Sequence, residues 1–165
     1  MRRALAVLFL ASLAACGGGR DPSTPREALD ALRAVLLAGD GRAYLKLIDA
    51  ESRSRSKAEV RERRALIARG EDAAAVFRGL PLTPDEVKRG DEADVAALFL
   101  PRRSPLFRDA QWIADAAIDA ERQESEDATA IDLKGGDGGM RRLWFVREGG
   151  AWRFDNLRTR GEWPN

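Results

Sequence analysis

The chain has 165 residues, of which 33% are charged and 44% are hydrophobic, a balance typical of one globular domain rather than a disordered segment. Its 28 basic and 27 acidic residues give a formal net charge of +1, so no electrostatic basis for nucleic acid binding is present. The sequence contains no histidine and a single cysteine, which excludes internal disulfides and cysteine-rich metal sites and removes the commonest general base and metal ligand. We therefore expect no metal cofactor.

Residues 1–15 have the layout of a cleaved export signal. Two arginines at positions 2 and 3 precede an apolar stretch, residues 4–13, that is too short for a stable membrane span. The segment ends in Leu-Ala-Ala-Cys, residues 13–16, which resembles the lipobox of bacterial lipoproteins at every position. That resemblance implies cleavage before Cys16, a diacylglyceryl group on its thiol and acylation, as with palmitate, of the new amine.

The same resemblance implies a location in the cell envelope, with the membrane as a partner through the covalent lipid on Cys16. Two or more acyl chains anchor a protein stably, whereas one chain binds only marginally. Residues 16–23 begin with the cysteine and three glycines, so we expect a flexible tether. The residue after the cysteine is not aspartate, which in a Gram-negative host favours the outer membrane, facing the periplasm.

Helix signals dominate the chain from Thr24 to Pro101. Residues 24–27, Thr-Pro-Arg-Glu, form a capping box, and the apolar residues of 28–36 share one helical face that Gly39 ends. A short helix after Asp40 follows. Further helices are predicted from a capping box at Ser56 to about Ala68, over residues 73–80, from Thr83 to Gly90, and from Asp91 to a stop at Pro101.

The last third changes to the period of strands. Residues 128–133, 140–147 and 151–157 predict an antiparallel meander joined by glycine-rich turns. Residues 109–124 fit a strand by alternation and a helix by alanine content, and we predict a strand. Helices followed by such a sheet indicate an α+β fold over residues 24–157, with a C-terminal tail at 158–165.

Two stretches resemble NTF2-like (cystatin-like) bacterial lipoproteins of unknown function. Residues 25–49, PREALDALRAVLLAGDGRAYLKLID, are similar to their opening helices, and residues 143–157, LWFVREGGAWRFDNL, to their final hairpin. The resemblance implies N-terminal helices packed on a curved antiparallel sheet, the cone of that family. It covers both ends of the domain, while residues 51–110 are longer and more helical than in a minimal member.

Enzymes of the NTF2-like fold work in the mouth of the cone, commonly with Asp, His and Tyr. In this chain Tyr44 with Asp49 or Asp119 could supply a proton donor and a base for isomerase- or hydrolase-like chemistry. The alternative interpretation places Tyr44 at the edge of the core and Asp49 at a helix end or cap. We favour that non-catalytic interpretation.

Two features are candidate contact sites. Lys57, Arg61 and Arg64 lie beside Val60 on one helical face, an arrangement suited to an anionic membrane surface, although a solvated helix flank has the same pattern. Trp163 in the tail is a candidate partner anchor.

Three functions are consistent with these observations. The leading hypothesis is a lipid-anchored, non-catalytic module that binds an envelope protein or a small ligand. The second is the enzyme just described. The third is a structural or assembly dimer, which would need an extensive apolar outer face on the sheet.

Overall fold

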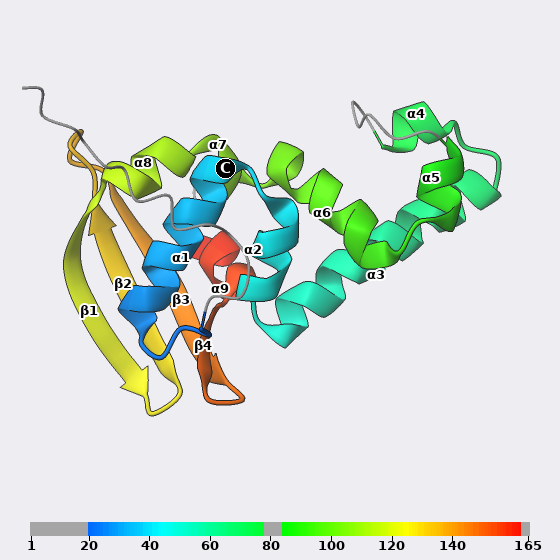
Figure 1. The fold of residues 1–165 in the computed structure, drawn as a ribbon. Coiled ribbons are helices and arrows are strands. Elements are labelled where there is room, and N and C mark those ends of the chain that lie inside the picture. The colour runs from blue at the N-terminus through cyan, green and yellow to red at the C-terminus, as the bar shows by residue number, and fades with distance from the viewer. Residues whose placement is uncertain (1–19, 78–83, 163–165) are drawn as a thin grey trace, which may run out of the picture.

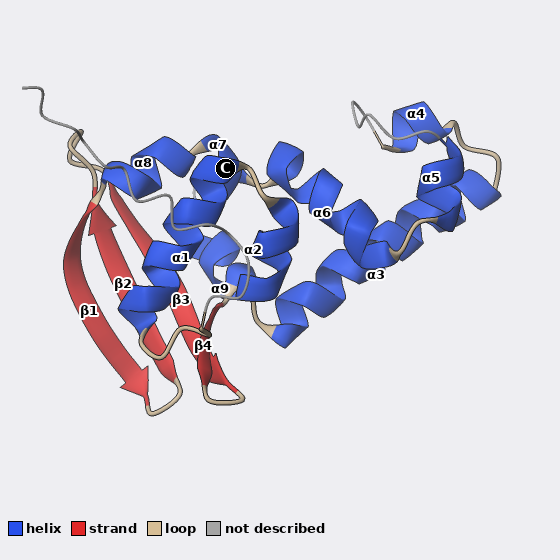
Figure 2. Ribbon diagram, in the orientation of Figure 1, coloured by secondary structure: helices blue, strands red, loops and turns tan. Residues whose placement is uncertain are grey.

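The structure is a computed structural model that describes residues 20–77 and 84–162 (Figure 1). Within these ranges the chain has an α+β fold, with helices first and a four-stranded antiparallel sheet near the C-terminal end. Figure 2 shows the sheet at one side of the molecule and a helical arm extending away from it at the other. Cys16, Leu80, Thr83 and Trp163 lie outside the described residues.

The described ranges contain these helices and strands in chain order: α1 (Pro25–Ala38), α2 (Gly41–Leu47), α3 (Ala50–Ala68), α4 (Ala73–Val76), α5 (Pro84–Arg89), α6 (Glu92–Arg103), α7 (Pro105–Arg108), α8 (Ala110–Asp115), β1 (Ala117–Ser125), β2 (Ala128–Lys134), β3 (Met140–Glu148), β4 (Ala151–Phe154) and α9 (Asn156–Glu162). None of the described helices is both long and apolar enough to cross a bilayer. The predicted α+β order is therefore confirmed.

Helix α1 forms as the sequence predicts. The hydroxyl of Thr24 accepts the backbone N–H of Glu27 at 3.2 Å, and the Glu27 carboxylate accepts the N–H of Ser23 at 2.7 Å. Gly39 ends the helix with φ of 65°, a left-handed conformation that glycine adopts without strain. The buried face of α1, with Leu29 and Leu32, joins the same core as the inner face of the sheet.

The sheet has the order β1-β2-β3-β4, and each strand is antiparallel to the next. Ile131 and Leu133 of β2 and Leu143 and Phe145 of β3 are fully buried on the inner face. Because side chains alternate along a strand, the residues between them point to the outer face. The predicted meander of three strands is confirmed, and β1 adds a fourth strand at the edge.

The outer face of the sheet is charged rather than apolar. Asp132 accepts hydrogen bonds from Arg142 at 2.6 Å and from Arg122 at 3.0 Å. The Arg142 bond, together with the charges of both arginines, holds the pKa of Asp132 below its usual range. Beside this cluster, the guanidinium of Arg158 lies 3.2 Å from the ring centre of Trp144. The apolar outer face that the dimer hypothesis needs is not found on these strands.

Two predicted boundaries were wrong in the helical part. Helix α3 begins after Asp49 rather than at Ser56, whose hydroxyl lies inside the helix and donates to the carbonyl of Ser52 at 2.9 Å. Helix α6 continues past Pro101 to Arg103, because the missing N–H and the freed carbonyl of Ala97 are accommodated at a contact with α2 that is described below. The helix predicted over 73–80 is present over Ala73–Val76, and residues 78–80 lie outside the described residues.

The strand predictions near the ends of the sheet also need correction. Residues 109–124 are divided between α8 and β1, since the alanine-rich first part is helical and the alternating part pairs with β2. Strand β4 ends at Phe154 rather than at residue 157, and α9 begins at Asn156 and takes in residues 158–162 of the expected tail. This last helix covers the part of β3 that β4 does not reach, where Thr159 accepts the N–H of Trp144 at 2.9 Å.

The helical arm consists of α3 and α6, packed together, with α4 and α5 at the end far from the sheet (Figure 1). Arg63 lies over the ring of Phe99 at 4.6 Å and over that of Phe77 at 5.7 Å. The guanidinium of Arg64 donates to the carbonyls of Val87 and Gly90, which closes α5 against α3.

Candidate functional site

Tyr44, the candidate acid, is fully buried. Its hydroxyl donates to Oδ1 of Asn156 at 2.9 Å, and its ring meets the edge of Phe107 at a centroid distance of 5.1 Å. Burial raises the pKa of Tyr44 well above its usual value of 10.0. A phenol held in this way is a core hydrogen-bond donor. The prediction that Tyr44 lies at the edge of the core, with its hydroxyl in reach of water, is therefore wrong.

The two candidate bases lie in different surroundings. Asp49 is the N-cap of α3, where Oδ1 accepts the N–H of Ser52 at 2.8 Å, while Oδ2 is one of the buried side-chain atoms without a partner in the described chain. The prediction that Asp49 caps a helix is confirmed. Asp119 is exposed on β1, at an irregularity in the pairing between Ile118 and Ala120. The structure thus leaves Asp119 in solvent while Tyr44 is enclosed in the core.

The three basic candidates of α3 are separated by their partners. Arg61 forms an ion pair with Glu92 at 2.7 Å, and Nε of Arg64 donates to the carbonyl of Val87 at 2.6 Å. Both arginines therefore connect α3 to the segment that follows it. Lys57 alone remains exposed beside a groove.

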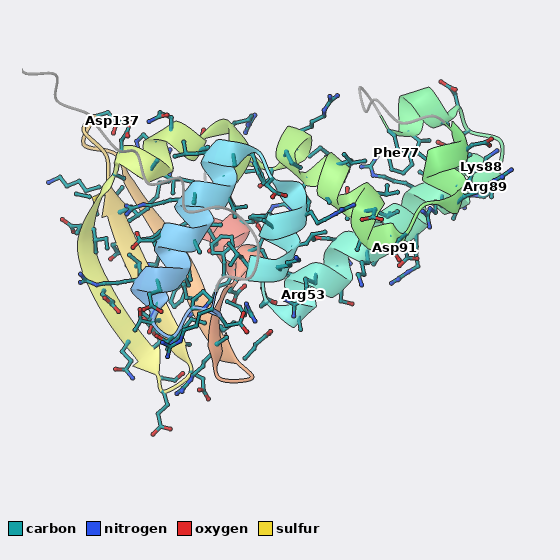
Figure 3. All side chains as sticks on the ribbon, in the orientation of Figure 1. Arg53, Phe77, Lys88, Arg89, Asp91 and Asp137 are labelled. Atoms are coloured by element: carbon teal, nitrogen blue, oxygen red, sulfur yellow. The ribbon has the colours of Figure 1, made fainter. Side chains whose placement is uncertain are left out.

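That groove runs along α2, between α1 and α6, where Figure 1 shows α2 lying between these helices. Its volume is about 1180 Å³, and a smaller hollow of about 550 Å³ continues it toward the start of α3, where Figure 3 labels Arg53. The two hollows share Asp21, Arg42, Lys46, Asp94 and Arg153, and we treat them as one site, the α2 groove.

A close helix contact forms the base of the α2 groove. A Cβ atom on Gly41 would lie 1.8 Å from the carbonyl oxygen of Ala97, so only glycine lets α2 cross α6 this closely. Pro101 has no N–H to offer that carbonyl, which leaves the oxygen directed at Gly41. Asp40 fixes the start of α2 by accepting the N–H groups of the next two residues after Gly41 at 3.0 and 2.9 Å.

The walls of the α2 groove are largely apolar. Helix α1 contributes Ala34 and Val35, and α6 contributes Ala97, Leu98 and Pro101. Leu98 is 48% exposed, so its side chain is available to anything that enters the groove. The walls therefore suit the hydrocarbon part of a ligand.

The rim of the groove is positively charged. Its lining residues include seven basic side chains, Arg20, Arg42, Lys46, Arg53, Lys57, Arg102 and Arg153, and three acidic ones, Asp21, Asp40 and Asp94. Three of the basic groups have partners: Arg42 pairs with Asp94 at 2.6 Å, Arg153 with Asp21 at 2.9 Å, and Arg53 with Glu148 at 3.5 Å.

The remaining four cations of the rim, Arg20, Lys46, Lys57 and Arg102, are exposed and have no ion pair within the described ranges. We call these four residues the rim cations. They come from the N-terminal segment, α2, α3 and α6. Asp40 is the lining carboxylate that has no ion pair within the described ranges, and Arg20 also interacts with the charge of Glu27. An anion on the groove would therefore meet an excess of positive charge from these elements.

The N-terminal segment enters the domain at the same groove. The carbonyl of Pro22 accepts the N–H of Trp152 on β4 at 2.9 Å, and Asp21 is paired with Arg153 of the same strand. The chain is thus held against the sheet from residue 21 onward. Arg20, the first described residue, lies at the rim of the groove.

Most of the rim was missed at the level of sequence. Arg42 and Lys46 are four residues apart on the exposed side of α2, a pattern that could have been found. Arg20, Arg102 and Arg153 are far apart in the chain, and only the fold brings them together. Of the predicted surface contacts, Lys57 alone belongs to the groove.

Comparison with protein-family models, with curated proteins and with solved structures found no match. Within the described ranges, no group of three or more His, Cys, Asp or Glu side chains is placed to hold a metal ion. The α2 groove, with apolar walls and a basic rim, is suited to an anionic ligand that also has an apolar part.

Proposed function

We propose that this chain is the precursor of a lipid-anchored cell-envelope protein whose domain binds an anionic ligand in the α2 groove without catalysing a reaction. The observation that carries the proposal is the set of four unpaired rim cations above apolar walls. An anion bound there would neutralise the excess positive charge of the rim cations.

We further propose that the fold is the NTF2-like cone. Support comes from the curved antiparallel sheet, from α1 packed on its inner face, and from the final hairpin of β3 and β4 (Figure 2). The arm formed by α3 to α6 is an addition to that plan, and it supplies one wall of the groove through α6.

The enzyme hypothesis has less support. Proton abstraction needs a donor and a base that both contact the substrate. Tyr44 is enclosed in the core with its hydroxyl bonded to Asn156, whereas Asp119 is exposed on β1. Neither residue lines the α2 groove.

The anchor is tested on the full chain in bacteria supplied with labelled palmitate. We expect the label in the mature protein and expect it to be absent from a Cys16→Ser variant, which should leave the membrane fraction. An unlabelled wild-type protein would refute the anchor, whatever the domain binds.

The groove is tested by native mass spectrometry of residues 17–165, with a long-chain fatty acid as the probe. We expect one bound molecule per chain, and at least tenfold weaker binding in a Lys46→Gln/Arg102→Gln variant, because two rim cations are lost. Equal binding by both proteins, or none by either, would contradict a ligand site at this groove.

A further inference from the structure

We propose that the α2 groove is the face on which the domain rests against its own membrane, with the headgroups of anionic phospholipids as the ligand of the rim cations. The inference rests on the proposed lipid anchor and specifies the ligand of the same groove. Three independent observations support it.

The first observation is where the chain enters the domain. The chain is fixed to β4 from residue 21 by the Asp21–Arg153 ion pair and the Pro22–Trp152 hydrogen bond. Only three residues, all glycines, lie between Cys16 and Arg20, and a fully extended chain covers about 14 Å from the first Cα to the last. A lipid on Cys16 would therefore hold the rim of the α2 groove next to the headgroups. The far end of the arm would lie farther from the membrane.

The second observation is charge complementarity. The rim cations are exposed and unpaired among the described residues, and Asp21 and Asp94 already have partners in Arg153 and Arg42. A basic residue near an anionic membrane surface strengthens binding about fivefold. Without residues 1–15, which contain two arginines and no acid, the chain has 26 basic and 27 acidic residues and a formal charge of -1. The attraction to an anionic surface would therefore come from the gathering of these four cations on one face and not from the net charge.

The third observation is an exposed apolar side chain that lines the same groove as these charges. Leu98 is 48% exposed on α6, and Arg102 follows it by one helical turn. Asp94, one turn before Leu98, is paired with Arg42. An apolar residue with a cation beside it is the pattern of surfaces that lie at the boundary between headgroups and acyl chains. Leu98 would enter that boundary while Arg102 remains with the phosphates.

Charge at the groove is tested by sedimentation of residues 17–165 with vesicles of phosphatidylcholine alone or with phosphatidylglycerol added. We expect binding only to the anionic vesicles, decreasing as salt is raised. A Lys46→Gln/Lys57→Gln variant should bind about 25-fold more weakly. Lys88→Gln/Lys134→Gln is the matched control, because it removes the same charge at the far end of the arm and beside the turn that carries Asp137 (Figure 3).

Orientation is tested with the same vesicles. Residues 17–165 contain no cysteine, so a polarity-sensitive fluorophore can be attached at one introduced site. We expect the emission of a Leu98→Cys conjugate to shift to the blue on anionic vesicles. The emission of a Met140→Cys conjugate should not shift, although Met140 is almost equally exposed, at 47%.

Equal losses in the two lysine pairs, equal shifts at both labelled sites, or no binding to anionic vesicles would overturn the inference. These experiments contain no anchor, so they cannot fail because Cys16 is unmodified. Binding of the fatty acid without binding to vesicles would contradict this inference. The proposal of an anionic ligand in the α2 groove would then stand without the membrane as that ligand. Absence of the palmitate label would refute the anchor separately.

Discussion

Gly41 determines how closely α2 approaches α6, and its replacement is the most direct test of the groove at the residue scale. We expect Gly41→Ala to lower the free energy of unfolding by about 1–3 kcal/mol, because the added methyl group would overlap the carbonyl of Ala97 and force the helices apart. Urea denaturation measures the change. Gly136→Ala is the control, since nothing lies within 4 Å of the position of its added Cβ.

Asp132 predicts a pH dependence that can be assigned to one carboxylate. Its pKa is lowered below 3.8 in the folded protein, chiefly by the hydrogen bond from Arg142, so the unfolded state binds the proton more readily. The stabilisation is present above the unfolded pKa and is lost as the pH falls toward the lowered folded value. Urea denaturation between pH 3 and pH 6 should show a smaller loss of stability for Asp132→Asn than for the wild type. Parallel curves would show that this carboxylate does not couple folding to pH.

At the scale of elements, α9 acts as a cover for the open edge of β3. Thr159 is fully buried and accepts the N–H of Trp144, so Thr159→Val would leave that group without a partner. We expect a loss of about 1–3 kcal/mol in the free energy of unfolding. Thr159→Ser keeps the acceptor and should recover most of it; equal losses in both variants would assign the effect to packing alone.

The elements that could be predicted from the sequence are those whose signals are local. The capping box of α1 and the glycine turns of the sheet fix their own boundaries. The start of α3 could not be predicted, because Asp49 and Ser56 both have capping side chains and the choice depends on the packing of Ser52 and Ser56 in the folded core.

The same limit explains the missed candidate site. Pro101 is a stop signal by local rules, whereas in the fold α6 continues through it at the point where Gly41 lies against the carbonyl of Ala97. The rim cations lie on separate elements, so no spacing in the chain relates them. The cap role of Asp49 was predicted correctly, because it follows from neighbouring residues. Tyr44 was predicted at the edge of the core, and its full burial could not be predicted because its partner Asn156 is distant in the chain.

At the scale of the whole molecule, one continuous core joins the arm to the sheet. Phe77 and Phe99 of the arm belong to the same buried cluster as Phe145 and Phe154. We therefore expect a single unfolding transition in urea. Circular dichroism reports mainly on the helices and tryptophan fluorescence on the sheet region, where Trp144 and Trp152 lie. Different midpoints for the two signals would show that the arm unfolds independently.

The fixed entry of the chain beside the groove also has a consequence for affinity. Under the proposed anchoring, the groove and the headgroups are joined by a tether of a few residues, which gives an effective concentration on the order of millimolar. A contact whose dissociation constant is also about millimolar is then occupied for much of the time, so high-affinity binding is not needed. Modest changes in salt or lipid charge would also break this contact. The domain would then move between a state in contact with the membrane surface and one away from it, while the lipid anchor remains in the membrane.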